Sequence, residues 1–335
     1  MGSAQENIAR SMSNTFKNRT ADIINAKTFD EFYSIYEQEL FADMAEMLRL
    51  DTAFNMVRAR DCGVVSSIFF KGCIKNAKSV TRRGADMTTA SLDIIGGVTV
   101  IDSLAVVKQF VYDEKAVSMA ELAAAVNNNW SGYEELHTLI SKKGKFFGND
   151  DETSNEAAQR FTTSIYEFLK DKRDFMGKKY LVGDLIGYHQ HNVWFGKLTG
   201  ATPDGRYDGD MISFGAGQSN GRDRNGLTAL LNSVAKYDPT GIMNAMSVTN
   251  VLIDEQLIRN DESFEKLVDM FETYFKNGAN HFQLSYVSKE DLLNAKVTPE
   301  KYKNLRVRVS GFSDFFVNLN DDLQDEIITR TVKEA

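Results

Sequence analysis

The chain has 335 residues, of which 42% are hydrophobic and 26% are charged, and its formal net charge is −8 at pH 7. This is the composition of an ordinary globular protein that is long enough to bury one large core or two smaller ones. The acidic balance argues against nucleic acid or an anionic membrane as partners, and no apolar run approaches the roughly 18 residues that a membrane helix needs. With only two cysteines, we expect a cytoplasmic protein that is neither secreted nor membrane-spanning.

Helical patterns dominate the first two hundred residues. Thr28 is followed three positions later by Glu31, and Ser118 is followed in the same way by Glu121. Each pair has the spacing of a capping box, so each predicts that a helix begins there. A third helix is predicted from Ser154 to about residue 176.

Helices and strands alternate in the rest of the chain. The expected elements are a helix at 225–236, a strand at 243–253, a helix at 263–277, a strand at 281–287, a helix at 289–295, a strand at 305–309 and a final helix at 321–331. This alternation indicates an α/β architecture.

A glycine close to the C-terminus follows one of these strands directly. Val307 and Val309 alternate with Arg306 and Arg308, the pattern of a short strand, and the strand runs into Gly311. Three phenylalanines follow within the next five positions. A glycine at a strand end most often provides a positive φ angle. Glycine is also the residue best suited to hold a radical at Cα, because no side chain opposes a planar, delocalised centre.

The residues around Gly311 distinguish these two roles. Arg308-Val-Ser-Gly-Phe312, followed by Asp-Asp-Leu-Gln-Asp-Glu-Ile-Ile-Thr-Arg-Thr at 321–331, resembles the glycyl radical signature of the pyruvate formate-lyase family. In that family Arg-Val-Ser-Gly-Tyr or Arg-Val-Ala-Gly-Tyr precedes an acidic helix that ends in Ile-Ile-x-Arg-Thr. The resemblance implies that Gly311 stores the radical.

The same resemblance assigns a role to the neighbours of this glycine. Arg308, Val309, Ser310 and Phe312 become the residues that an activating enzyme recognises. Phe312 replaces the usual tyrosine, so any contribution of that hydroxyl to loop packing or recognition is absent here.

Other segments resemble the family as well. They are 98–108, which contains Asp-Ser-Leu-Ala; 147–151, Phe-Gly-Asn-Asp-Asp; 196–206, which ends in Pro-Asp-Gly-Arg; and 223–236, a predicted helix and its entry. The resemblance therefore runs from roughly residue 28 to the end of the chain.

The substrate-activating cysteine of the family has no counterpart here. Many members carry it in a Gly-Cys-x-x-Glu motif, whereas Cys62 is followed by Gly-Val-Val and Cys73 by Ile-Lys-Asn. Family members are also more than twice as long, and this chain resembles their C-terminal portion. The resemblance implies a split enzyme or a fragment, whose partner polypeptide carries the cysteine loop.

The implied fold is the C-terminal half of a ten-stranded α/β barrel, that is, a five-stranded half barrel wrapped by helices. Residues 1–200 would form its mainly helical part, and residues 201–335 the glycyl radical domain, with the radical loop at 308–316. Such a half barrel leaves sheet edges and an apolar inner face uncovered, so it needs a partner.

The implied function is that of the radical-bearing subunit or fragment of an anaerobic dehydratase, decarboxylase or lyase. No cofactor would be bound permanently; an iron-sulfur activating enzyme that uses S-adenosylmethionine would install the radical on Gly311. The radical would pass to the partner's cysteine, which acts on a small organic substrate. The alternatives are a repair component that replaces a damaged glycine loop, and a degenerate half barrel that only binds a partner.

Two groups of polar residues are weaker candidates. His281, Gln283 and Ser285 share one face of a predicted strand, where they either line the barrel interior or form hydrogen bonds within the core. His189 and His191 would share a face of another strand, but no third ligand is near in sequence, so we expect structural histidines and no metal.

Overall fold

The computed structural model describes residues 4–61, 63–184, 191–245, 247–253, 256–309, 312–329 and 332–333. The helices are α1 (Ala9–Asn18), α2 (Thr20–Asn25), α3 (Phe29–Arg58), α4 (Val64–Ser67), α5 (Gly97–Val106), α6 (Met119–Asn127), α7 (Glu134–Lys143), α8 (Glu152–Leu169), α9 (His191–Gly196), α10 (Gly226–Ala235), α11 (Gln256–Arg259), α12 (Asp261–Lys276), α13 (Lys289–Val297) and α14 (Asp321–Thr329). The strands are β1 (Ala4–Asn7), β2 (Ala90–Ile95), β3 (Tyr180–Asp184), β4 (Asn250–Ile253), β5 (Gln283–Tyr286), β6 (Arg306–Arg308), β7 (Ser313–Phe315) and β8 (Val332–Lys333).

Parallel strands form the centre of the fold. One sheet has the order β1-β2-β3, and in a second sheet β4 lies between β5 and β8. Backbone hydrogen bonds join the two: Val182 N–H donates to the Ile242 carbonyl (2.8 Å), and Val248 N–H donates to the Asp184 carbonyl (3.1 Å). The chain that leads into β4 therefore lies beside β3, which connects the two parallel sheets in an α/β arrangement consistent with a five-stranded half barrel.

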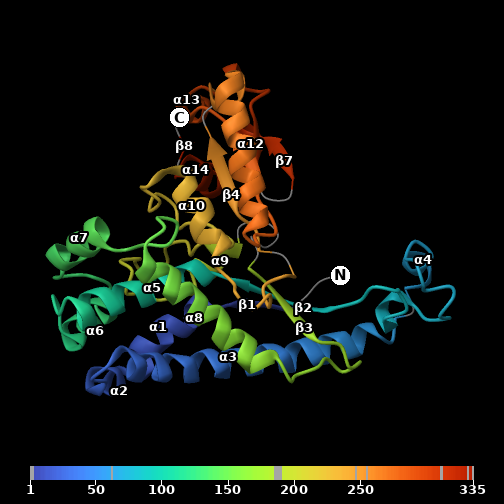
Figure 1. Ribbon diagram of the computed structural model, residues 1–335, viewed down its shortest axis with the longest axis horizontal. Helices are drawn as coiled ribbons and strands as arrows, with labels where there is room; N and C mark the ends of the chain where they lie inside the picture. Colours follow the sequence, from blue (N-terminus) through green and yellow to red (C-terminus); the bar gives the residue numbers. More distant parts are fainter. Residues whose placement is uncertain are drawn as a thin grey trace.

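Helices cover these strands in two parts of the molecule. In Figure 1 the long α3 runs along the base together with α1, α2 and α8, and the chain from β4 onward rises above this base. Helix α3 packs against α1 and β1, and α5 packs against α8. Among the described residues, no helix is long and apolar enough to cross a membrane.

Two of the three early helices begin where the capping pairs predict. Thr28 Oγ1 accepts a hydrogen bond from Glu31 N–H (3.2 Å), and Ser118 Oγ accepts one from Glu121 N–H (3.1 Å). The predicted bounds of the third helix were wrong. Helix α8 is capped by Asp151, whose Oδ1 accepts from Thr153 N–H (2.9 Å), so it begins before Ser154.

The same helix ends at residue 169, before the expected end near residue 176. The chain there turns around Asp174, whose Oδ1 accepts hydrogen bonds from the backbone N–H groups of Met176 (3.0 Å) and Lys178 (2.7 Å). This turn leads into β3, a strand that the sequence pattern did not predict.

Two strand predictions were also wrong in part. The expected strand at 243–253 is regular only in β4, although the chain before it bonds to β3. His191 begins helix α9 and does not lie on a strand, while His189 is outside the described residues. The described residues contain no cluster of three or more metal-ligating side chains.

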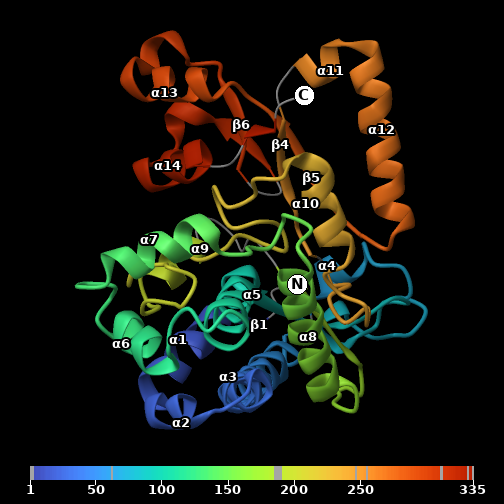
Figure 2. The ribbon, with the colours of Figure 1, turned by 60° about the vertical axis from the view of Figure 1, so that its left-hand side comes forward.

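The buried apolar side chains of the described residues form one large core, one smaller core and two minor clusters of three and two residues. The large core extends from Ile8 to Tyr274, so it includes residues on both sides of position 200. The smaller core, which we call the second core, consists of Leu292, Ala295, Val307, Val309, Phe316, Leu323 and Ile327. Figure 2 shows its elements, α13, β6 and α14, grouped together beyond β4. The domain division at residue 200 stays a prediction.

Candidate functional site

The predicted radical loop joins the two strands of a β-hairpin. Strands β6 and β7 are antiparallel, with Arg308 opposite Ser313, and Val309 N–H donates a hydrogen bond to the Phe312 carbonyl (3.0 Å). Residues 310–311, which include the proposed radical-bearing glycine, lie outside the described residues. The described ends of the loop are thus held together as in a tight hairpin.

The hairpin is held in place by apolar packing in the second core. Val307 and Val309 are buried in it, and Phe316, just beyond β7, is fully buried. The Phe312 side chain is 37% exposed. Of the proposed activase-recognition residues, Val309 is therefore covered and Phe312 is accessible; Ser310 lies outside the described residues, and the recognition role stays a prediction.

The face of β5 lies beside the same hairpin. Arg308 Nε donates a hydrogen bond to Gln283 Oε1 (3.2 Å), and a cavity of about 910 Å³ is lined by His281, Gln283, Ser285 and Arg308, among others. Burial and the nearby Arg308 charge lower the pKa of His281. The three candidate barrel-lining residues thus meet at one cavity next to the hairpin, although their lining of a closed barrel stays a prediction.

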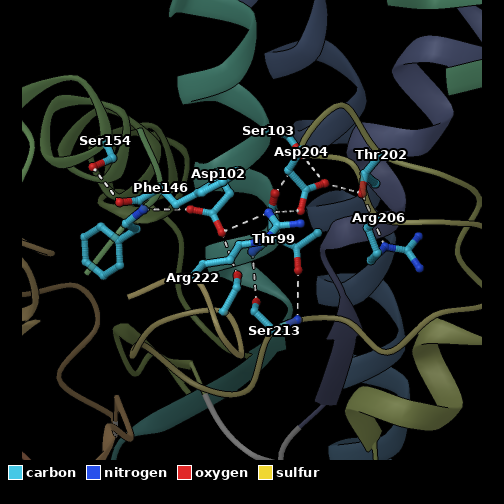
Figure 3. A network of polar contacts seen from close by, with 12 residues as sticks. Thr99, Asp102, Ser103, Phe146, Ser154, Thr202, Asp204, Arg206, Ser213 and Arg222 are labelled. Atoms are coloured by element: carbon cyan, nitrogen blue, oxygen red, sulfur yellow. Dashed lines mark hydrogen bonds and ion pairs between the residues drawn. The ribbon is translucent and has the colours of Figure 1, made fainter. Parts of the chain in front are cut away.

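A buried polar network centred on Asp102 of α5 holds the long loop at 199–226 in place (Figure 3). Asp102 Oδ1 accepts from Phe147 N–H (2.8 Å), and its Oδ2 accepts from Ser219 Oγ (2.6 Å). Burial raises the pKa of Asp102 to about 6, while the Arg222 guanidinium, 3.5 Å from Oδ2, opposes that rise.

Asp204 is the second carboxylate of this network. Arg222 Nη1 lies 2.7 Å from Asp204 Oδ2, and Oδ1 accepts hydrogen bonds from Thr202 Oγ1 (2.5 Å) and Ser103 Oγ (3.2 Å). Arg206 donates to the carbonyls of Asp210 (2.7 Å) and of residues 199 and 200. Arg206 therefore closes the loop on itself, while Arg222, Asp204 and Ser219 connect the loop to Asp102 and Ser103 of α5.

The segment at 147–151 completes the same assembly. The Asn149 amide group donates to the Arg222 carbonyl (2.9 Å), and its Oδ1 accepts from Arg224 N–H (2.6 Å). Asp150 Oδ1 forms an ion pair with Lys236 (2.6 Å). All four family-like segments outside the hairpin thus meet in one place. The sequence did not predict this meeting, although the concentration of Asp, Asn and Arg in these segments could have indicated a shared polar network.

Another buried carboxyl group, outside this network, lies at the end of β3. Asp184 Oδ2 accepts a hydrogen bond from Tyr237 Oη (2.8 Å), and burial raises the pKa of Asp184 to about 7. A Cβ on Gly97 would lie only 2.4 Å from this Oδ2, so Gly97 has to be glycine for the carboxyl group to fit. Sequence analysis did not single out Asp184.

Two exposed contacts connect the long loop at 199–226, and the residue that follows α9, to α14, the helix after the hairpin. Asn220 Nδ2 donates to Thr329 Oγ1 (3.1 Å), and Lys197 Nζ lies 3.1 Å from Asp322 Oδ2. Exposed contacts of this kind contribute little energy, on the order of 1 kcal/mol or less each. These contacts add to the Arg308–Gln283 hydrogen bond and to the pairing of β8 with β4, which also connect this part of the chain to the rest of the molecule.

Comparisons with known proteins agree with this arrangement. Residues 5–196 match the model of the family described as pyruvate formate lyase-like, and residues 212–317 match the model described as glycine radical. Trans-4-hydroxy-L-proline dehydratase of Clostridioides difficile is 31% identical over 93% of this chain, and isethionate sulfite-lyase of Desulfovibrio desulfuricans is 32% identical over the same share. These matches cover 39% and 38% of the two relatives.

Solved structures give the same result. The glycerol dehydratase of Clostridium butyricum, 30% identical, superposes with a TM-score of 0.90 over 99% of this chain and 43% of its own. The hydroxyproline dehydratase of Clostridioides difficile also has a TM-score of 0.90, at 29% identity. The chain spans about two fifths of the length of these relatives, and it belongs to the pyruvate formate lyase-like family of glycyl radical enzymes.

Proposed function

We propose that this chain is the radical-bearing part of a dehydratase- or lyase-type glycyl radical enzyme, with Gly311 as the storage residue. The observation that carries the proposal is the β6–β7 hairpin, which brackets residues 310–311 and lies within the match to the glycine radical model. The named relatives, two dehydratases and a sulfite-lyase, support the reaction class.

The chemistry at Gly311 begins with loss of a hydrogen atom from Cα. An iron-sulfur activating enzyme that uses S-adenosylmethionine removes this atom after recognising residues 308–312. The unpaired electron is then delocalised over the neighbouring amide and carbonyl groups, and the absence of a side chain permits the planar geometry. The backbone hydrogen bond between Val309 and Phe312 (3.0 Å) holds the described ends of the loop together, which favours return of the hydrogen atom to the same place in each cycle.

The stored radical acts through a cysteine that this chain does not supply. Gly311 takes the hydrogen atom of a cysteine S–H, which restores glycine and leaves a thiyl radical that removes a hydrogen atom from substrate. Cys73 is buried and lines a cavity to which no residue of the hairpin contributes, while Cys62 lies outside the described residues. We therefore place the cysteine on the polypeptide that supplies the part of the fold absent here.

The substrate in this proposal is a small organic molecule, from which the thiyl radical starts cleavage of a C–O, C–S or related bond. By their names, the relatives act on hydroxyproline, isethionate and glycerol, all of them small and polar. The structural match over 99% of the chain favours a constitutive part of such an enzyme over a repair component that replaces only the glycine loop.

Exposure of the activated protein to oxygen tests the storage site. A Cα radical combines with O₂, and the resulting oxidised glycine breaks the backbone at that residue. We expect mass spectrometry to find scission at Gly311, which separates the last 24 residues (312–335), only after anaerobic activation and only in the wild type. A Gly311→Ala variant should stay intact. Scission at another residue, or equal scission in the variant, would place the radical elsewhere.

A further inference from the structure

A segment that extends from the body of the molecule carries an unusual share of exposed apolar side chains. It comprises residues 50–89, namely the end of α3, α4 and the turns that lead to β2, and we call it the arm; in Figure 1 α4 lies at the far end of the long axis. Eleven of the 26 exposed large apolar side chains of the described residues fall in these 40 residues, which identifies the arm as the main uncovered apolar surface: Leu50, Phe54, Met56, Val57, Val64, Val65, Ile68, Phe69, Phe70, Ile74 and Met87.

Internal hydrogen bonds give the arm a defined shape. Val80 N–H donates to Ser67 Oγ (2.9 Å), and Asn76 Nδ2 donates to the Gly84 carbonyl (2.9 Å). Arg83 ties the arm to the turn before β3 through an ion pair with Asp174 (2.8 Å), whose carboxylate is buried. The exposed apolar side chains therefore stand on a folded surface and are not the result of an unfolded segment.

The arm also contains a cavity. A cavity of about 880 Å³ lies between α4, the turns after it and the chain before β3. Its lining combines apolar side chains (Val64, Ile68, Ile74, Met176) with basic ones at Lys78 and Lys178. A cavity of this size accommodates several side chains of another protein.

The charge of the arm differs from that of the rest of the chain. The arm contains seven Lys and Arg residues and three Asp residues, a net charge of +4 in a chain of net charge −8. A surface that combines exposed apolar side chains with a net positive charge favours a partner surface that is apolar and acidic.

We propose that the arm binds the polypeptide that supplies the remainder of this family's fold, through an apolar surface with an acidic rim. This inference rests on the proposed function. The solved relatives contain the arm-bearing region and the remainder in one chain, of which this chain matches 43%. A part of the fold larger than this chain is therefore available to cover the arm.

The charge and shape of the arm favour this partner polypeptide over a second copy of the chain and over a lipid bilayer. A second copy of the chain would bring another arm of charge +4 against the first, so the two arms would repel each other. An anionic lipid bilayer would satisfy the charge, but its flat surface does not fill a concave cavity.

The test measures binding of a matched pair of variants. The partner probe is the polypeptide from the same genome, encoded separately or upstream, that matches the remainder of the family fold and carries Gly-Cys-x-x-Glu; it is co-purified with this chain. The arm variant is Phe69→Ser with Ile74→Ser, at 79% and 77% exposure, and the control is Leu198→Ser with Val297→Ser, at 72% and 80%. Circular dichroism verifies that both variants fold.

We expect the arm variant to raise the Kd of the complex at least about a hundredfold, since two apolar side chains lose their burial, and the control to change it less than threefold. Lys75→Glu with Lys78→Glu should weaken the complex as well, more strongly at low salt. Equal affinity of the arm variant and the wild type, or no complex in the wild type, would overturn the inference. The wild type could also self-associate or bind phosphatidylserine vesicles. If the arm variant abolishes either interaction, the arm binds a second copy of the chain or an anionic bilayer, and the inference is overturned.

The same samples keep this inference separate from the proposed function. If the complex forms through the arm but no radical appears on Gly311, the proposed function fails and the docking surface stands. If the radical forms and the arm variant binds normally, the docking surface fails and the proposed function stands.

Discussion

The guanidinium of Arg222 forms an ion pair with Asp204, Nη1 to Oδ2, over 2.7 Å, which joins two distant parts of the long loop; Asp204 also accepts a hydrogen bond from Ser103 of α5. The same Nη1 lies 3.5 Å from Asp102 Oδ2, so a single arginine forms ion pairs with two buried carboxylates. Removing it leaves both carboxylates buried without their cation, the situation in which the loss of an ion pair is most costly.

We expect Arg222→Met to lower the free energy of unfolding by about 3–5 kcal/mol in urea denaturation. The control is Arg224→Met, because Arg224 also approaches the Phe146 ring but bonds through its side chain to the carbonyls of residues 141 and 142 at the surface. Loss of those contacts should cost no more than about 1.5 kcal/mol. Equal effects of the two substitutions would show that the network does not stabilise the loop.

The Asp184–Tyr237 pair predicts a pH dependence of stability. The pKa of Asp184 is raised to about 7 in the folded chain from an ordinary value of 3.8, so between these values the folded chain holds a proton that the unfolded chain releases. This contribution to stability is greatest below about pH 4 and is lost as the pH rises through 7. Its size is on the order of 4 kcal/mol.

Asp184→Asn isolates this effect, because the amide oxygen can still accept from Tyr237 but does not titrate. Urea denaturation of both proteins between pH 4 and pH 8 should show the wild type losing stability relative to the variant as the pH rises. A difference that stays constant over this range would mean that Asp184 is ionised in the folded chain.

Two glycines with almost the same backbone conformation provide a test of the loop packing. Gly215 has φ +72° and Gly221 has φ +73°, but a Cβ at Gly215 would lie 2.2 Å from the Val248 carbonyl oxygen, whereas nothing lies within 4 Å of one at Gly221. Gly221→Ala should therefore cost only the strain of a positive φ, about 1–2 kcal/mol. Gly215→Ala should cost at least about 2 kcal/mol more, since the backbone itself must move.

Thermal unfolding of the two glycine variants side by side measures this difference. If both variants melt at the same temperature, the close approach of the loop to Val248 does not exist in solution.

The second core predicts local destabilisation around the hairpin. Phe316 is fully buried in this small cluster, and replacing such a side chain with alanine costs about 3–5 kcal/mol. In Phe316→Ala, hydrogen–deuterium exchange should accelerate in residues 287–328 and stay unchanged around α5 and α8, because their side chains belong to the large core. Phe161 lies in that large core, so in Phe161→Ala hydrogen–deuterium exchange should accelerate around α5 and α8 and stay unchanged in residues 287–328. Uniform acceleration in Phe316→Ala would show that the two cores unfold together.

Sequence patterns identified the elements whose signals are local. The capping pairs Thr28/Glu31 and Ser118/Glu121 predicted helix starts correctly, because a cap depends only on residues three positions apart. The helices at 226–235 and 261–276 follow the expected apolar periodicity. The family assignment came from the residues around the glycine and was confirmed by both family models.

The sequence did not reveal the elements that depend on distant partners. Strand β1 reads Ala-Gln-Glu-Asn, with no apolar alternation; its polar Asn7 is buried because the side chain donates to Thr199 Oγ1 (2.8 Å), far along the chain. Strand β2 carries Asp93 at a buried position. In the same way, the Asp102–Arg222–Asp204 network joins segments that no local pattern relates.

Anaerobic electron paramagnetic resonance detects whether Gly311 stores the radical. The chain is mixed with an activating enzyme, S-adenosylmethionine and a reductant, with and without the cysteine-bearing polypeptide, and Gly311→Ala is the control. We expect an organic radical signal that the remaining Cα hydrogen splits into a doublet and that is absent in the variant. The same signal in Gly311→Ala, or no radical in the wild type under either condition, would contradict it.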